Sequence, residues 1–192
     1  MSQKPIIVGD ITVNYTMSET GGLSGTSLKE AGKTLYIKGK MARADFTSSD
    51  YKQTIIYDNK TGNAVVLKEL GAAKYLTRLS TEQWKKENAR FEGMDVTFSD
   101  EKQTIIGYEC KKATLTLKDG SVYYAYYTSS IIPSTTENPY QFKDIPGLVL
   151  EFETSADTKS KKIKFTATSV NLSPVPASKF ELPTSGFRVI QQ

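Results

Sequence analysis

Apolar and polar residues alternate along most of this chain, and short turn sequences interrupt the alternation. Because successive side chains of a β-strand point to opposite faces, the pattern predicts strands that bury one face. In residues 34–46, Leu35, Ile37 and Met41 are expected on the face opposite Lys38 and Lys40. The chain is therefore expected to be mainly β, with strands at 6–17, 34–46, 51–57, 64–67, 73–79, 102–117, 121–128, 148–152 and 163–170.

Two turn sequences and one helix organise these strands. Residues 58–62 and 118–120 each carry a glycine-containing turn that joins two strands into a hairpin. Ser80 and Gln83 have the spacing of a capping box, which predicts a helix start, and Gly93 suits its end. Trp84 and Phe91 are seven residues apart and are expected on one face of this helix. The fold class is thus mainly β with a helical part (α+β).

The chain has 192 residues, which favours a single domain spanning 1–192. Its last part, about 173–192, contains Pro174, Pro176 and Pro183 and is expected to be extended or to form an edge strand. No apolar stretch approaches the ~20 residues of a membrane-spanning helix. Residues 1–5 show no signal peptide or lipidation cysteine, so the chain is either cytosolic or a mature secreted protein whose signal was removed.

The absence of histidine excludes more kinds of chemistry than any other count. Without histidine there is no Ser-His or Cys-His catalysis and no imidazole metal ligand. The single cysteine, Cys110, excludes an internal disulfide and is expected to be a buried structural thiol. Phosphate-binding glycine motifs are also missing. We therefore expect no cofactor, no metal and no enzymatic activity.

The net charge of +4 comes from 25 basic and 21 acidic residues, and only four of the basic residues are arginine. Nucleic-acid grooves rely on arginine for bidentate and stacking contacts, so we expect no nucleic-acid partner. The scattered lysines are interpreted as a solvated surface. Weak attraction to an anionic membrane surface or to an acidic partner is the alternative.

Three segments together resemble a known family. Residues 142–152 read Phe-Lys-Asp-Ile-Pro-Gly-Leu-Val-Leu-Glu-Phe, residues 106–113 read Ile-Gly-Tyr-Glu-Cys-Lys-Lys-Ala, and the third segment is Tyr-Tyr-Thr-x-x-Ile-x-Pro at 126–133. They resemble the GLPGLI family of Gram-negative envelope proteins, which is related to domains of unknown function with a fold like that of the lipoprotein carrier LolA. The chain has Asp-Ile-Pro-Gly-Leu-Val at 144–149, which keeps the Pro-Gly-Leu centre of the family motif and departs from its first residue.

The resemblance implies a curved antiparallel half-barrel, LolA-like, with one or more helices covering its concave face. It also implies a periplasmic or cell-envelope location with the signal peptide removed. An aromatic-rich concave face would suit a lipid, a lipoprotein acyl chain or another hydrophobic small molecule. The residues expected to bind this ligand are Trp84, Phe91, Tyr124, Tyr126, Phe142, Ile145 and Leu148.

Alternative interpretations stay open at this point. The same aromatic residues could simply form the core, and a one-residue slip would exchange Tyr124 and Tyr126 for Tyr123 and Tyr127 on the inward face. A second hypothesis is an envelope assembly or adaptor module that uses an exposed sheet edge or the proline-containing tail to bind a protein partner. A weaker third hypothesis is a hydrolase with an unusual carboxylate or lysine centre.

Overall fold

The computed structural model describes residues 4–20, 31–155 and 162–191. Within them the fold is mainly β, as predicted, with one large curved sheet and a single α-helix. The strands are β1 (Ile6–Val8), β2 (Asp10–Thr20), β3 (Gly32–Lys38), β4 (Met41–Thr47), β5 (Tyr51–Asp58), β6 (Ala64–Leu70), β7 (Ala73–Leu79), β8 (Asp95–Ile105), β9 (Tyr108–Thr116), β10 (Val122–Thr128), β11 (Ile131–Pro133), β12 (Leu148–Ser155), β13 (Lys162–Asn171) and β14 (Arg188–Ile190). The helical segments are α1 (Thr81–Glu87) and two 3-10 turns, η1 (Ala89–Phe91) and η2 (Ala177–Phe180).

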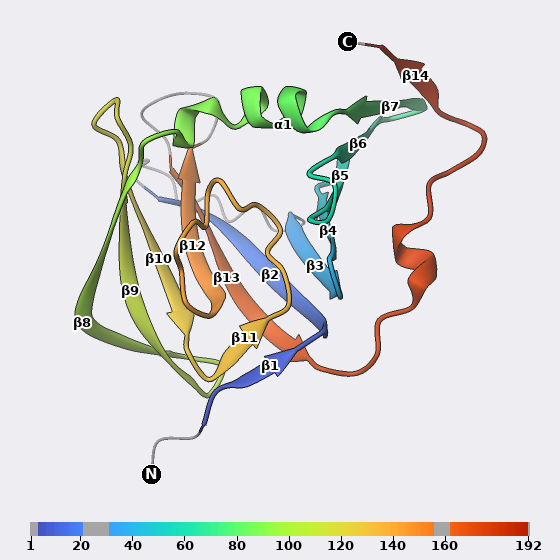
Figure 1. The fold of residues 1–192 in the computed structure, drawn as a ribbon. Helices are drawn as coiled ribbons and strands as arrows, with labels where there is room; N and C mark the ends of the chain where they lie inside the picture. The colour runs from blue at the N-terminus through green and yellow to red at the C-terminus, as the bar shows by residue number, and fades with distance from the viewer. Residues whose placement is uncertain (1–3, 21–30, 156–161, 192) are drawn as a thin grey trace.

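Twelve strands form the large sheet in the order β14-β7-β6-β5-β4-β3-β2-β13-β12-β10-β9-β8. All neighbours are antiparallel except β14, which pairs parallel with β7. The remaining strands, β1 and β11, form a separate parallel ribbon that lies beside the curled part of the sheet (Figure 1). The fold thus joins the first and middle parts of the chain through β1 and β11.

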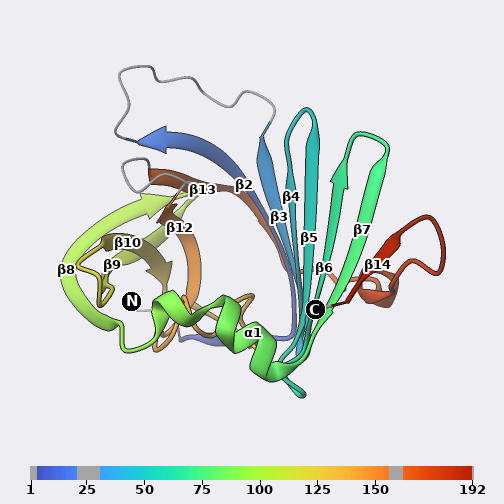
Figure 2. The same ribbon diagram turned by 90° about the horizontal axis from the view of Figure 1, so that it is seen from above.

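Figure 2 shows that the sheet curls strongly through β8, β9, β10, β12 and β13, whereas β3–β7 form a more regular fan. The register shifts follow the same division. They occur between β8 and β9, between β10 and β12, and between β13 and β2, and none interrupts the pairing of β3 to β7. Because an extra residue on one strand bends that strand and increases its twist, these bulges account for the curl.

Helix α1 begins where the sequence predicts. The Ser80 hydroxyl accepts a hydrogen bond from the Gln83 amide at 3.3 Å, and the Gln83 side chain accepts one from the Ser80 amide at 2.9 Å, which confirms the capping box. The helix is shorter than predicted because it ends at Glu87 and a 3-10 turn follows. Trp84 and Phe91 therefore do not share one helix, and they belong to different hydrophobic clusters.

Two segments predicted as single strands are hairpins. Residues 34–46 fold into β3 and β4 around Gly39, whose φ of 58° lies in the left-handed region. Across this two-residue turn Lys38 pairs with Met41, so Met41 lies on the face of Lys38. The prediction that Met41 shares the face of Leu35 and Ile37 is therefore wrong. Residues 102–117 similarly belong to β8 and β9, which turn at Ile106 and Gly107.

The two predicted hairpins at 58–62 and 118–120 are confirmed. The proline-containing tail runs along the outside of the sheet before β14 pairs with β7 (Figure 1). It is anchored by Val175, which is buried, and by the Arg43 guanidinium, which donates to the Lys179 carbonyl at 2.7 Å. The expected edge strand in this tail is confirmed by β14.

Cys110 is fully buried in β9, as the sequence predicts. Burial, the largest cause, raises the pKa of its thiol from 9.0 to about 11. We expect no reaction with a thiol reagent at neutral pH until the chain unfolds. Because the unfolded thiol ionises first, its contribution to stability should be lost as the pH rises from 9.0 to about 11.

This pH dependence can be measured by denaturant unfolding across that range, with Cys110→Ala as the control that lacks the thiol contribution. Rapid thiol labelling of the folded protein would contradict the buried position.

Candidate functional site

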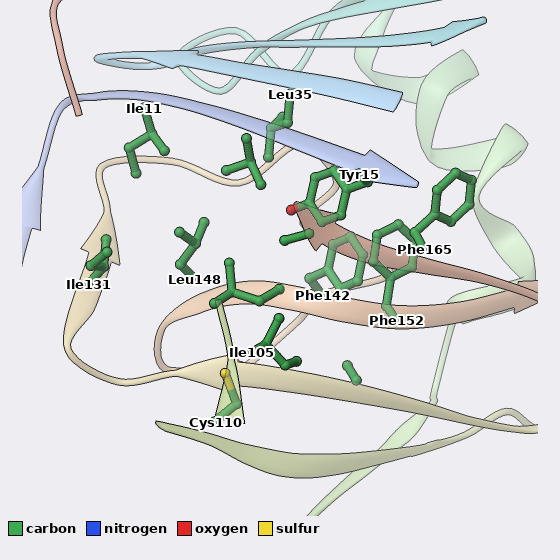
Figure 3. Close-up of a cluster of buried hydrophobic side chains, with 14 of the residues drawn as sticks. Ile11, Tyr15, Leu35, Ile105, Cys110, Ile131, Phe142, Leu148, Phe152 and Phe165 are labelled. Atoms are coloured by element: carbon green, nitrogen blue, oxygen red, sulfur yellow. The ribbon is translucent and has the colours of Figure 1, made fainter. Parts of the chain in front are cut away.

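A half-open pocket of about 400 Å³ lies on the concave face of the sheet. Its apolar wall comes from β2, β3, β11 and β12, and its remaining wall comes from the loop 134–147 between β11 and β12. Figure 3 shows Leu35, Tyr15, Leu148 and Phe142 converging from these elements. Such a volume falls within the range of pockets that hold small molecules. The lining residues are Tyr15, Leu35, Ile37, Ile132, Pro133, Thr135, Thr136, Glu137, Phe142, Ile145, Pro146, Gly147, Leu148 and Val149.

Helix α1 and this pocket lie on the same face of the sheet. The cross-strand row that begins at Ile37 continues through Ala42, Tyr57 and Ala64 to Leu79. Side chains paired in this way share one face. Since Trp84 of α1 packs against the far end of the row and Ile37 lines the pocket, the helix covers part of the concave face next to the pocket.

The loop 134–147 fills much of the remaining concavity. Asn138 shapes it, because its side-chain oxygen accepts from the backbone amides of Tyr140 and Gln141 at 3.0 and 3.1 Å. The Asn138 amide group donates to Asn88 at 2.8 Å, and Asn88 in turn donates to the Trp84 carbonyl at 2.9 Å. This chain of hydrogen bonds fixes the loop to the end of α1.

A largely buried ion pair ties the loop to the sheet. The Lys33 ammonium of β3 lies 2.6 Å from the Glu137 carboxylate, and the two side chains keep only 9% and 13% of their surface exposed. The same ammonium stands 4.5 Å from the centre of the Phe152 ring and 5.4 Å from those of Tyr15 and Phe165. Burial and the nearby Glu137 charge raise the pKa of the Tyr15 phenol well above 10.0. Glu137, which lines the pocket, is therefore held by an ammonium that also contacts aromatic rings behind it.

The Pro146–Gly147 turn forms part of the pocket wall and packs against the end of β10. A Cβ atom on Gly147 would lie 2.1 Å from the Thr128 carbonyl oxygen and 3.1 Å from the Ser129 Cα. Only glycine fits this close backbone approach without a shift. This close approach explains why glycine stands at the centre of the Pro-Gly-Leu motif.

Of the seven predicted ligand residues, the structure brings together Phe142, Ile145 and Leu148, which all line the 400 Å³ pocket. Trp84 lies on the same concave face but lines a separate, more polar pocket of about 290 Å³ beneath α1. Phe91 packs in a third place, with Met94, Leu115 and Leu117.

Tyr124 and Tyr126 are not brought to the apolar pocket. They line a polar pocket of about 180 Å³ together with Lys112, Glu151 and other residues, and this pocket shares no lining residue with the apolar one. The Tyr126 hydroxyl donates to Glu101 at 3.0 Å, and the Lys112 ammonium lies 4.1 Å from the Tyr124 ring. Their role in ligand binding stays a prediction.

Sequence reasoning missed several residues of the pocket. The alternation of the sequence places Leu35 and Ile37 on one face of a strand. Only their position in the folded sheet makes them pocket residues. The pocket residue Glu137 and its ion-pair partner Lys33, which lies outside the pocket lining, carry no signal in the sequence, because 104 residues separate them and each lies in a stretch typical of ordinary surface. Only the folded loop brings the pair together.

Among residues 4–20, 31–155 and 162–191, no three His, Cys, Asp or Glu residues cluster in a way that could hold a metal ion. In the same ranges, no helix has the length and apolar character needed to cross a membrane.

No protein-family model matches the chain. A search of curated proteins also finds no match. The resemblance to the GLPGLI family therefore stays a prediction.

Solved structures with a similar fold do exist. A structure of PNGF-II is similar over 96% of this chain and 31% of its own, at 13% identity and a TM-score of 0.56. The chain thus spans about a third of the length of that protein. An uncharacterized conserved protein from Thermus thermophilus matches over 94% of this chain and 90% of its own, at 9% identity and a TM-score of 0.53. At these identities the likeness is one of fold.

A putative outer membrane lipoprotein-sorting protein domain from Vibrio parahaemolyticus is also found. It covers 90% of this chain and 89% of its own at 11% identity, with a TM-score of only 0.22. Such a score is too low for an argument about function.

Proposed function

We propose that this protein is a non-enzymatic binding protein of the bacterial cell envelope that holds an apolar ligand, such as an acyl chain, in the 400 Å³ pocket. The observation that carries the proposal is the pocket itself. Most of its walls are aliphatic or aromatic, and polar groups gather at one end around Glu137, Thr135 and Thr136. An apolar body with one polar end matches this distribution.

The pocket lining supports a particular set of binding residues. Phe142, Ile145 and Leu148 would contact the ligand together with Leu35 and Ile37 from the facing strand. The loop 134–147 would act as the wall that closes over the ligand. The envelope location and the GLPGLI relationship are part of the same proposal and rest on the Pro146–Gly147–Leu148 sequence, which forms one edge of this pocket.

Native mass spectrometry of gently purified protein tests whether a ligand is present, and titration with a fluorescent fatty-acid probe tests whether the pocket can take one. We expect a bound species that leaves on organic extraction, and saturable uptake of the probe. Repeated absence of bound lipid, together with no uptake of the probe, would overturn the proposal. A protein partner recovered by crosslinking in that case would favour the adaptor hypothesis.

Filling the pocket should weaken binding without unfolding the protein. Ile145 is half-buried and lines the pocket, so tryptophan at this position can occupy the free volume. We expect Ile145→Trp to weaken probe binding by about tenfold or more, because it removes space equivalent to several buried methylene groups. The measurement is probe titration by fluorescence.

Ile55→Trp is the matched control, since Ile55 is also half-buried and lines the separate pocket beneath α1. It should leave probe affinity unchanged. If both variants weaken binding equally, the ligand does not occupy the 400 Å³ pocket.

A further inference from the structure

The ribbon of β1 and β11 exposes an unusual group of large apolar side chains. Ile7 is 78% exposed, Ile6 is 50% exposed, and Ile132 is 37% exposed. Ile7 pairs directly with Ile132, so these two side chains point to the same face of the ribbon. Ile6 pairs with Ile131 instead and therefore lies on the opposite face of the ribbon. We call Ile7 and Ile132 the lip. Apolar side chains gathered in this way mark an interaction surface.

The lip stands at the edge of the ligand pocket. Ile132 belongs to both, since it also lines the pocket beside Pro133. Its neighbour Ile131 points the other way and is buried in the main core (Figure 3). Buried Ile131 anchors β11, so the exposed isoleucines are held on a fixed ribbon.

Unpaired lysines surround the lip. The turn between β3 and β4 is joined to the ribbon by two bonds, from the Gly39 amide to the Gly9 carbonyl at 2.8 Å and from the Ser134 hydroxyl to the Gly39 carbonyl at 2.6 Å. This turn carries Lys40, which is exposed, and Lys4 is exposed two residues before Ile6.

The turn between β5 and β6 joins the same end of the molecule. Its Asn59 amide donates to the Lys40 carbonyl at 2.9 Å, and the Asn59 side chain donates to Thr135 of the pocket. Lys60 follows Asn59 and is exposed. Lys4, Lys40 and Lys60 form no ion pair within the described part of the chain.

The acidic groups at this end are already engaged. Asp10 pairs with the Lys38 ammonium at 3.1 Å and also accepts from the Val175 amide at 2.9 Å. The Asp58 carboxylate accepts from the Lys60 amide at 2.8 Å. Asp58 keeps its charge, but Lys4, Lys40 and Lys60 outnumber it, so this end of the molecule combines exposed apolar side chains with an excess of positive charge.

We propose that this end of the protein docks on an anionic lipid surface, with the lip inserted among the acyl chains and Lys4, Lys40 and Lys60 at the headgroups. Apolar side chains flanked by lysines are the combination that peripheral proteins use at such surfaces. The orientation brings the edge of the pocket to the membrane. It explains why isoleucines are exposed on a ribbon whose other face is core.

The test is co-sedimentation of the full chain with vesicles of phosphatidylethanolamine containing a quarter phosphatidylglycerol, compared with vesicles of phosphatidylcholine alone. We expect binding to the anionic vesicles only, and weaker binding at about 0.5 M salt, where charges are screened over a few ångströms. Ile7→Ser should lower the partition coefficient about tenfold. Lys40→Gln with Lys60→Gln should lower it by a similar factor.

Matched controls lie elsewhere on the surface. Leu70→Ser removes a side chain that is 52% exposed at the other end of β6, and Lys118→Gln removes an exposed lysine on the hairpin at the far end of β10 from β11. Both should bind vesicles like the parent protein. Equal losses in the controls, or no binding to anionic vesicles, would overturn the proposal.

A second copy of the chain is the competing occupant. If light scattering shows a dimer that Ile7→Ser converts to a monomer, the lip is a self-interface and the proposal fails. Ile7 does not line the pocket, so uptake of the fatty-acid probe in solution should survive Ile7→Ser. The docking surface and the ligand pocket can therefore succeed or fail separately.

Discussion

Replacing Gly147 by alanine is expected to lower the free energy of unfolding by about 3 kcal/mol, the upper part of the range for forced overpacking. The new methyl group would stand 2.1 Å from the Thr128 carbonyl oxygen, and the atoms it meets are all backbone. Neither side can move without disturbing the end of β10 or the pocket wall. Thermal or denaturant unfolding measures the change, and a fall of several degrees in Tm should accompany it.

Gly9→Ala is the matched control for this experiment. Gly9 has no atom within 4 Å of an added Cβ and no positive φ. Its replacement should change stability by less than about 0.5 kcal/mol. If Gly147→Ala is equally harmless, the Pro-Gly turn does not pack as the structure shows.

Removing Lys33 alone is expected to cost about 3 to 5 kcal/mol, because Lys33→Met leaves the Glu137 carboxylate largely buried and unpaired. Glu137→Leu should cost less, since the Lys33 ammonium would keep its contact with the Phe152 ring. The double replacement should recover much of the loss, because an apolar pair of similar volume needs no compensation for desolvation.

The three variants and the parent protein form a double-mutant cycle that equilibrium unfolding in denaturant can measure. A coupling energy well above about 1 kcal/mol is expected for an ion pair with so little exposed surface. Simple additivity of the two single changes would show that the pair contributes no net interaction. Retention of probe binding in the double variant would separate stability from ligand recognition.

The sequence predicts the strands well and the turns unevenly. Apolar and polar residues keep alternating across the β3–β4 turn, but the inward-facing positions change from odd to even numbers. Leu35 and Ile37 face inward before the turn, and Ala42 faces inward after it. Small alanine side chains carry too weak a signal to reveal this change. The glycine at 39 was the available clue, because a glycine inside a strand pattern favours a turn or bulge.

The second missed hairpin has a different cause. Its central residues, Ile106 and Gly107, both have positive φ. Turns of this kind favour Asn, Asp or Gly at the first position, and a β-branched residue is rare there. The conformational preference of isoleucine therefore disfavours a turn at this position, and the pairing of β8 with β9 outweighs that preference.

Part of the candidate site could be predicted because it is local in sequence. Phe142, Ile145 and Leu148 surround one turn, so the Pro-Gly motif brings them together directly. The phase of the Tyr-rich strand could not be predicted, since tyrosine suits either face of β10. In the structure Ala125 is fully buried in the core and Tyr127 is buried, whereas Tyr124 and Tyr126 line a polar pocket. Long-range pairs such as Lys33 and Glu137 require the folded loop.

The bulges in the curled half of the sheet lie at residues other than those that line the pocket, so they can change its size without changing its lining. The residues left without a directly opposed partner are Leu150 in β12, Thr168 in β13 and 99–101 in β8. None of them lines the pocket. A relative could therefore widen or narrow its cavity by inserting or deleting one residue in a strand, with every wall residue retained. The volume of the pocket and its chemical selectivity for a ligand can then change independently in this architecture.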